Sequence, residues 1–173
     1  MAKTVDLFRH TDADGDVLTD AGVRAALEAG SQLHDDYHLF ISSGAQRATQ
    51  TAACLLAGRG GRVPGGVVVD PRFRSTVEDR WKAAYEAAGA GDIPSFEKAD
   101  PELVEKESRL LGEALREVFE RLPDGGRALI IGHSPIQEAA VYGLTGQVTE
   151  PLPKGAGVRV TQAAGGYRIE RID

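Results

Sequence analysis

Four short apolar runs, separated by segments long enough for helices, place the strongest constraint on the fold. The runs are TVDLF at 4–8, HLFIS at 38–42, GVVVD at 66–70 and ALIIG at 128–132. Short runs of this kind, rich in β-branched residues, are typical of buried strands. Strands that alternate with helices favour a mostly parallel sheet with helices on both faces. We therefore expect a three-layer α/β/α sandwich.

The segments between these runs carry helical signals. Helices are expected over 19–33, 45–58, 100–122 and 135–144. The first is expected to begin after Thr19, a residue type that caps helices, with Asp20 in its first turn. Leu and Val side chains recur at steps of three and four in the third segment, as on one face of an amphipathic helix. The alternating runs at 157–161 and 166–172 predict a hairpin at the edge of the sheet.

Residues 71–99 interrupt this pattern. They contain Pro, Gly and mixed charges with weak periodicity, so we expect a loop excursion over the sheet and not a second domain. A chain of 173 residues has the size of one domain and can bury roughly 70% of the surface of its unfolded form. We therefore predict a single domain over residues 1–173.

Composition excludes several classes of protein. A formal net charge of -6 at pH 7 argues against general affinity for nucleic acid, so an anionic substrate needs local positive charge. The single cysteine, Cys54, excludes an intrachain disulfide and a cysteine-rich metal site. No apolar run approaches the ~18 residues of a membrane span, and strand signals begin at once in MAKTVDLF, without a signal peptide. We expect a cytoplasmic protein with no membrane or nucleic-acid partner.

Charged side chains follow the ends of three predicted strands, where ligands bind in sheets of this kind. Arg9 and His10 follow the first strand, Arg47 comes soon after the second, and His133 follows the fourth. Arginine offers a planar fork to phosphate oxygens, while a neutral histidine can attack phosphorus and a charged one can bind an oxygen. The N-termini of the following helices add positive potential. The sequence therefore predicts a site for a phosphoryl group.

Four motifs, in this order, resemble those of the histidine phosphatase superfamily, which has the phosphoglycerate-mutase-like fold. They are LFRHT (7–11), LTDAG (18–22), SSGAQRATQTA (42–52) and GHSP (132–135), and together they span nearly the whole chain. The resemblance implies that His10 accepts the phosphoryl group and that Arg9, Arg47 and His133 form the phosphate pocket. It also implies that no metal or other cofactor is needed. Short members of the family include phosphohistidine phosphatases.

Two positions depart from the family pattern. Thr11 replaces the usual glycine after Arg–His, and we expect its hydroxyl to donate to the phosphate. The general acid of the family is often a glutamate after the third strand, where this chain has Ser75. Glu78 can take that role if the loop is shifted, Asp12 is a second candidate, and the position can also be vacant.

These residues predict a metal-independent phosphatase that hydrolyses a phosphomonoester, or a protein phosphohistidine, through a phosphohistidine on His10. A phosphoglycerate-mutase-type phosphotransferase and a phospholigand-binding module with little turnover are the alternatives. A further alternative is a magnesium-dependent phosphatase in which Asp12 of DADGDVL is the nucleophile. We favour it less because such an aspartate directly follows the strand, whereas RHT separates Phe8 from Asp12 here.

Overall fold

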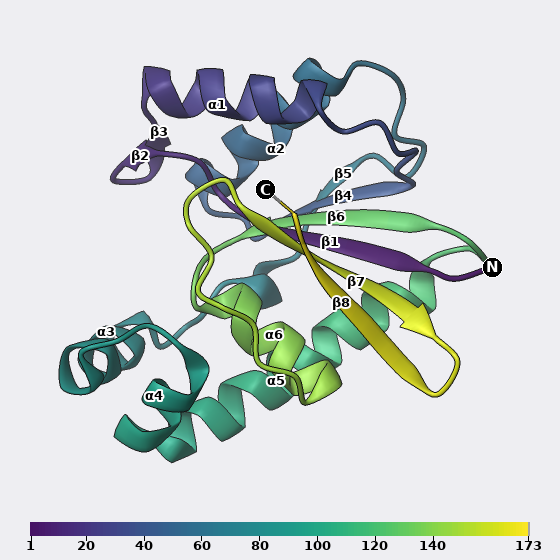
Figure 1. The fold of residues 1–173 in the computed structure, drawn as a ribbon. Helices are drawn as coiled ribbons and strands as arrows, with labels where there is room; N and C mark the ends of the chain where they lie inside the picture. The colour runs from purple at the N-terminus through teal and green to yellow at the C-terminus, as the bar shows by residue number, and fades with distance from the viewer. Residues whose placement is uncertain (173) are drawn as a thin grey trace.

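A six-stranded sheet forms the centre of the computed structural model, which describes residues 1–172 (Figure 1). Its strands are β1 (Thr4–Arg9), β4 (Leu39–Ser42), β5 (Val67–Val69), β6 (Arg127–Gly132), β7 (Gly157–Ala163) and β8 (Gly166–Ile172). They lie in the order β5-β4-β6-β1-β7-β8. The strands from β5 to β1 are parallel to their neighbours, and β7 and β8 join antiparallel. The predicted mostly parallel sheet and its edge hairpin are thus confirmed.

Helices cover both faces of the sheet. On one face lie α1 (Asp20–Ser31) and α2 (Gln46–Arg59), and on the other lie α5 (Pro101–Arg121) and α6 (Ile136–Thr145) (Figure 1). Each of these helices begins and ends within two residues of the bounds expected from the sequence. The three-layer α/β/α sandwich is therefore confirmed.

Strand β6 shows how the sheet separates two cores. Ala128 and Ile130 belong to the apolar cluster that includes α5 and α6, whereas Leu129 and Ile131 belong to the cluster that includes α2. All four side chains are fully shielded from solvent. Because successive side chains of a strand point to opposite faces, a strand covered on both faces needs a continuous apolar run. The sequence ALII supplies that run.

The expected loop excursion at 71–99 is wrong in its secondary structure. The segment contains a short 3-10 helix, η1 (Pro71–Phe73), and two α-helices, α3 (Glu78–Ala88) and α4 (Ile93–Ala99). Each of the two α-helices buries only a pair of apolar residues: Trp81 and Ala84 in α3, and Ile93 and Phe96 in α4. So few buried positions leave little periodicity in the sequence. These residues join the core cluster that includes α5 and α6.

A small hairpin before α1 was also not predicted. Its strands are β2 (Ala13–Asp14) and β3 (Val17–Leu18), where the sequence indicated only a polar turn. The predicted cap is confirmed, because the Thr19 hydroxyl oxygen accepts a hydrogen bond from the Gly22 amide at 3.0 Å. A Cβ at Gly22 would lie 2.0 Å from the Asp12 carbonyl oxygen. The glycine of LTDAG is therefore needed for the close approach of this loop to the helix.

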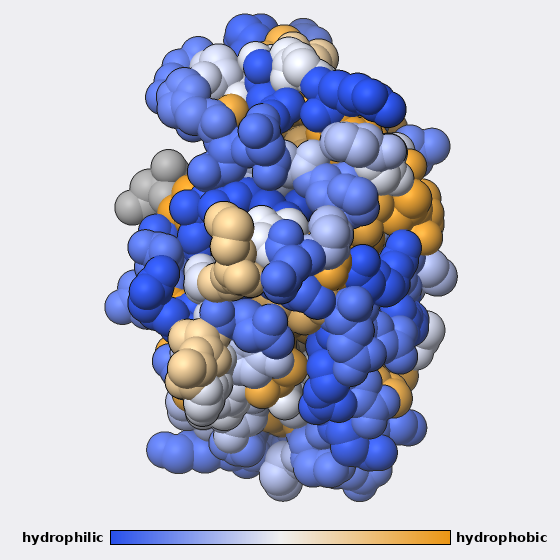
Figure 2. Space-filling model, turned by 90° about the vertical axis from the view of Figure 1, so that its right-hand side faces the viewer, coloured by the Kyte–Doolittle hydropathy of each residue, from blue (hydrophilic) through white to orange (hydrophobic). Residues whose placement is uncertain are grey.

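The residues predicted to bind phosphate lie at one end of the parallel strands. Figure 2 shows the side near the N-terminus, which is mostly hydrophilic with smaller apolar areas between. The residues predicted to bind phosphate follow the opposite, carboxyl ends of β1, β4 and β6. No helix within residues 1–172 is long and apolar enough to cross a membrane.

The crossing of α5 and α6 predicts a destabilising substitution. A Cβ at Gly143 would lie 1.7 Å from the Ser108 carbonyl oxygen, so the added methyl group must push the two helices apart. Gly143→Ala should lower the free energy of unfolding by about 1–3 kcal/mol, the usual cost of overpacking. Gly166→Ala is the control, since nothing lies within 4 Å of its added Cβ. Urea denaturation of the two variants should differ clearly, and equal stability would contradict the prediction.

Candidate active site

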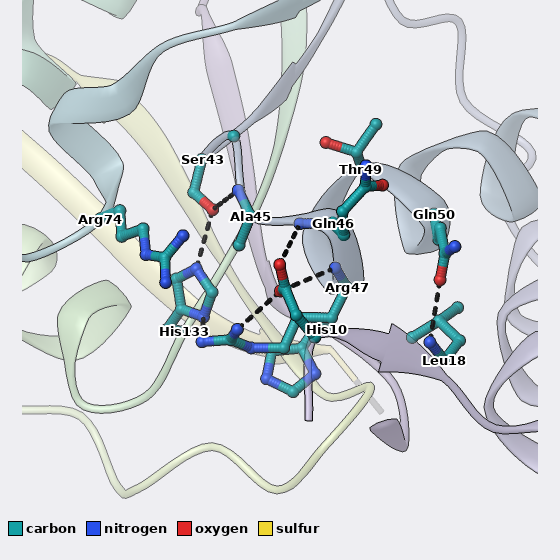
Figure 3. Close-up of polar contacts among 12 residues, drawn as sticks. His10, Leu18, Ser43, Ala45, Gln46, Arg47, Thr49, Gln50, Arg74 and His133 are labelled. Carbon is teal, nitrogen blue, oxygen red and sulfur yellow. Dashed lines mark hydrogen bonds and ion pairs between the residues drawn. The ribbon is translucent and has the colours of Figure 1, made fainter. Parts of the chain in front are cut away.

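Three adjacent strand ends bring the predicted residues together. Strands β4, β6 and β1 are neighbours in the sheet and parallel. His10 follows β1, Arg47 lies in the first turn of α2 after β4, and His133 follows β6. The ring centroids of the two histidines are 5.5 Å apart, and Arg47 extends beside both rings (Figure 3). The sequence prediction of one shared pocket therefore agrees with the geometry.

The ring of His10 is held in one tautomer by a backbone group. Its Nδ1 lies 2.7 Å from the Thr11 carbonyl oxygen. Because a carbonyl only accepts, Nδ1 carries the proton and donates it, and Nε2 keeps its lone pair. Burial, and to a lesser extent the cations Arg47, Arg9 and Lys154, lower the pKa of His10, although the bond to Thr11 opposes this. The ring is thus kept neutral, as a nucleophile requires.

His133 has hydrogen-bond partners at both ring nitrogens (Figure 3). The Arg47 guanidinium donates to Nδ1 at 3.3 Å, so Nε2 carries the proton and donates to the Ser43 hydroxyl oxygen at 2.7 Å. Burial, followed by Arg47, His10 and Arg74, lowers the pKa of His133 to about 3. We expected a charged histidine here. Instead the ring is neutral, because it is buried and because nearby cations such as Arg47 and Arg74 disfavour a further positive charge.

Asp16 holds the guanidinium of Arg47 from the opposite side. Its carboxylate accepts from the Arg47 side chain at 2.8 Å and from the amides of Gln46 and Arg47 at 3.2 and 3.3 Å. Burial raises the pKa of Asp16, but the two amide bonds and the guanidinium together lower it below its usual value. The carboxylate therefore stays ionised at the N-terminus of α2, where a negative charge is favoured.

Arg9 is anchored through the backbone of Leu152. Its guanidinium donates to the Leu152 carbonyl oxygen at 3.0 Å, and the Leu152 amide donates to the buried carboxyl group of Glu138 at 3.4 Å. Glu138 also accepts from the Ser134 hydroxyl, and burial raises the pKa of its carboxyl group. A chain of hydrogen bonds thus connects Arg9 to the residue that follows His133.

The hydroxyl of Thr11 is used inside the fold. We expected it to donate to the phosphate, but it donates to the Gly22 carbonyl oxygen at 2.8 Å. The side chain is buried and also lies beside the Thr51 hydroxyl. Thr51 in turn accepts from the Thr11 amide at 3.2 Å. Thr11 therefore joins the loop after β1 to α1 and α2, and its hydroxyl proton is already used in the bond to Gly22.

The candidate acids lie in different surroundings. Asp12 is exposed and accepts from Lys154 at 2.9 Å and from Thr19 at 2.8 Å. These bonds, that to Lys154 first, lower the pKa of the Asp12 carboxyl, which disfavours it as a proton donor. Ser75, which we expected at the position of the family acid, donates to the Glu107 carboxylate at 2.5 Å.

Glu78 is the candidate acid that borders the pocket. It is the first residue of α3, and it lines the same cavity as Arg47 and His133. Its carboxylate accepts from Arg74 at 3.1 Å, and Arg74 extends toward His133 (Figure 3). The shift of three residues from the family position is therefore compatible with a place at the mouth of the pocket.

A family model decides the identity of the chain. Residues 3–142 match the model of the histidine phosphatase superfamily, branch 1. The chain belongs to this superfamily. A comparison with curated proteins found no match.

Solved structures of other proteins share the fold. Phosphoglycerate mutase from Bacillus anthracis str. Sterne has a TM-score of 0.73 at 19% identity, over 99% of this chain and 92% of that one. Phosphoserine phosphatase from Entamoeba histolytica, in complex with 3-phosphoglyceric acid, has a TM-score of 0.71 at 14% identity, over 99% and 97%. The protein histidine phosphatase SixA, complexed with tungstate, has 0.63 at 19% identity, over 96% and 94%. These likenesses confirm the phosphoglycerate-mutase-like architecture.

Sequence reasoning missed three polar residues of this histidine phosphatase pocket: Asp16, Ser43 and Arg74. Ser43 belongs to a motif that was recognised, but its bond to His133 joins two distant strand ends. Asp16 lies in a hairpin that carries no strong strand signal. Arg74 directly precedes Ser75, and its position beside the expected acid was the available signal.

The low pKa of His133 predicts that stability depends on pH. The ring is neutral in the folded protein, whereas a histidine in an unfolded chain has a pKa of about 6.5. Below that pH the unfolded chain binds a proton that the fold excludes, so the free energy of unfolding falls by up to about 1.4 kcal/mol per pH unit. His133→Gln should lose less stability between about pH 7 and about pH 5 in urea denaturation. Equal losses in both proteins would show that the folded ring takes up a proton.

Proposed function

We propose that this chain is a phosphatase that hydrolyses a phosphomonoester, or a protein phosphohistidine, through a phosphohistidine on His10. The observation that carries the proposal is the hydrogen bond from His10 Nδ1 to the Thr11 carbonyl oxygen. It leaves Nε2 unprotonated on a ring whose pKa is lowered by burial and by Arg47 and Arg9. A neutral nucleophile beside cations suits an attack on an anionic phosphoryl group.

The reaction has two steps in this proposal. Nε2 of His10 forms a bond to phosphorus while the bond from phosphorus to the leaving oxygen breaks. Arg9 and Arg47 bind the remaining phosphoryl oxygens, and the dianion favours protonation of His133, which then donates to it as well. Water next attacks the phosphohistidine, the phosphorus–nitrogen bond breaks, and inorganic phosphate leaves a neutral His10.

Glu78 supplies the proton of the leaving group in this scheme. Its carboxylate accepts a hydrogen bond from the Arg74 guanidinium at 3.1 Å. The two opposite charges therefore partly neutralise each other. A bound phosphoryl group attracts Arg74 and weakens that bond. The protonated acid then donates to the departing oxygen, and the carboxylate formed accepts a proton from the attacking water.

The relatives support hydrolysis more than transfer. They include a phosphoserine phosphatase and a protein histidine phosphatase, as well as a phosphoglycerate mutase. Asp16 places a negative charge on Arg47, which disfavours a second phosphate group on the same substrate. We therefore propose release of inorganic phosphate to water as the main outcome.

His10→Ala is the direct test of the nucleophile. The variant should reduce hydrolysis of p-nitrophenyl phosphate to background and should form no acid-labile phosphoenzyme, because no other residue can replace the attacking nitrogen. Asp12→Asn is the matched control and should keep both. Turnover by the wild type should also persist in EDTA, since the charged groups proposed to bind phosphate are protein cations. Activity that survives in His10→Ala but not in Asp12→Asn, or that needs magnesium, would overturn the proposal.

Glu78→Gln tests the proton donor by its dependence on the leaving group. Hydrolysis of an alkyl phosphate should fall by ~10²-fold or more, because the departing alkoxide needs a proton. Hydrolysis of p-nitrophenyl phosphate should change little, because nitrophenolate leaves unprotonated. Asp79→Asn removes a neighbouring charge from the same first turn of α3 and should affect neither substrate. Equal losses on both substrates in Glu78→Gln would instead indicate a binding or structural role.

A further inference from the structure

A cavity of about 320 Å³ adjoins the phosphate pocket. It is bordered by Arg47 and His133 on one side and by α3, α4 and the start of α6 on the other. Helices α3 and α4 stand at the same end of the molecule as the carboxyl ends of the parallel strands (Figure 1). Because the cavity shares Arg47 and His133 with the phosphate pocket, a group esterified to a bound phosphate enters it.

Half of the residues that line this cavity are apolar or aromatic. Trp81 and Phe96 pack edge to face with ring centroids 5.1 Å apart, and the Tyr85 ring lies 6.4 Å from that of Phe96. Pro135 and Ile136 complete the lining from the start of α6. Tyr85 is 54% exposed, so its ring offers apolar surface that the fold itself leaves uncovered.

Two polar groups that line this cavity already have hydrogen-bond partners within the fold. The indole nitrogen of Trp81 donates to Glu107 at 3.1 Å, and the Ser134 hydroxyl donates to Glu138. The charged side chains, Glu78 and Lys82, are exposed in the first two turns of α3. A sugar placed against the Trp81 and Ser134 side of the cavity would lose hydration without gaining hydrogen bonds from these two groups, which costs free energy. An apolar ring would lose nothing of this kind.

We propose that this cavity binds a flat aromatic ring in the leaving group of the substrate. The inference rests on the proposed phosphatase function, because it assigns the part of the substrate that departs. The ring packs mainly against Tyr85, whose ring adjoins the buried Phe96, and its linking oxygen stays at the pocket mouth beside Glu78. Aromatic rings prefer such offset or edge-to-face neighbours. The substrate class is therefore a phosphate ester or phosphoramidate of a small ring-bearing group.

Binding can be measured without turnover. Trp81 is the only tryptophan of the chain, so its fluorescence reports on this cavity. Phenylphosphonate, which cannot be hydrolysed at its carbon–phosphorus bond, should shift that fluorescence and bind about tenfold more tightly than methylphosphonate, as expected for burial of one ring. Equal affinities for the two phosphonates would overturn the proposal.

Turnover by two alkyl phosphates gives an independent measurement. Ethyl phosphate and 2-phenylethyl phosphate have leaving groups of similar acidity but differ by one ring. The wild type should show kcat/KM about tenfold higher for the ring-bearing ester. Tyr85→Ala should lose most of this preference, whereas Tyr85→Phe, which keeps the ring, should retain it. Loss in both variants would assign the effect to the Tyr85 hydroxyl and overturn the aromatic site.

The two proposals fail in different ways. If phenylphosphonate binds preferentially but no ester is hydrolysed, the phosphatase function is wrong and the ring site stands. If esters are hydrolysed through His10 without any preference for the ring, the phosphatase function stands and the ring site is wrong.

Discussion

The guanidinium of Arg47 connects the parts of the molecule that form the pocket. One of its nitrogens binds Asp16 in the β2–β3 hairpin, and another binds His133 after β6. The same residue lies in the first turn of α2, whose amides also bind Asp16. A planar fork with fixed donor directions can make these bonds together, whereas a lysine would offer one point charge. One side chain thus links the hairpin, the helix and the second histidine.

The pattern of apolar residues was sufficient to predict the sheet and the four covering helices. Runs such as ALII in β6 must be buried on both faces. In a chain of this length, a sheet with helices on both faces is the arrangement that buries them. Helices α3 and α4 escaped prediction because each buries only two apolar residues. Their stability comes from packing against the core cluster that includes α5, which local sequence does not reveal.

The site was predictable as a set of residues but not as a set of bonds. The strand ends identified His10, Arg47 and His133 because parallel strands bring their carboxyl ends to one edge. The Thr11 hydroxyl donates to the Gly22 carbonyl oxygen only because this glycine comes close in the folded chain. His133 is neutral because the fold buries it beside cations. Both are properties of the assembled fold.

The bond between Asp16 and Arg47 affects how tightly phosphate can bind. The pocket already contains its own anion, placed on the guanidinium and on the amides of α2. In the proposed reaction, the phosphoryl group therefore competes with a tethered carboxylate for the same donors and does not simply neutralise free cations. On that proposal, the affinity for phosphate is the difference between two anion–cation interactions, and Asp16 can take back its bonds once the phosphorus–nitrogen bond to His10 has broken. Such a pocket favours rapid departure of inorganic phosphate over tight retention of it.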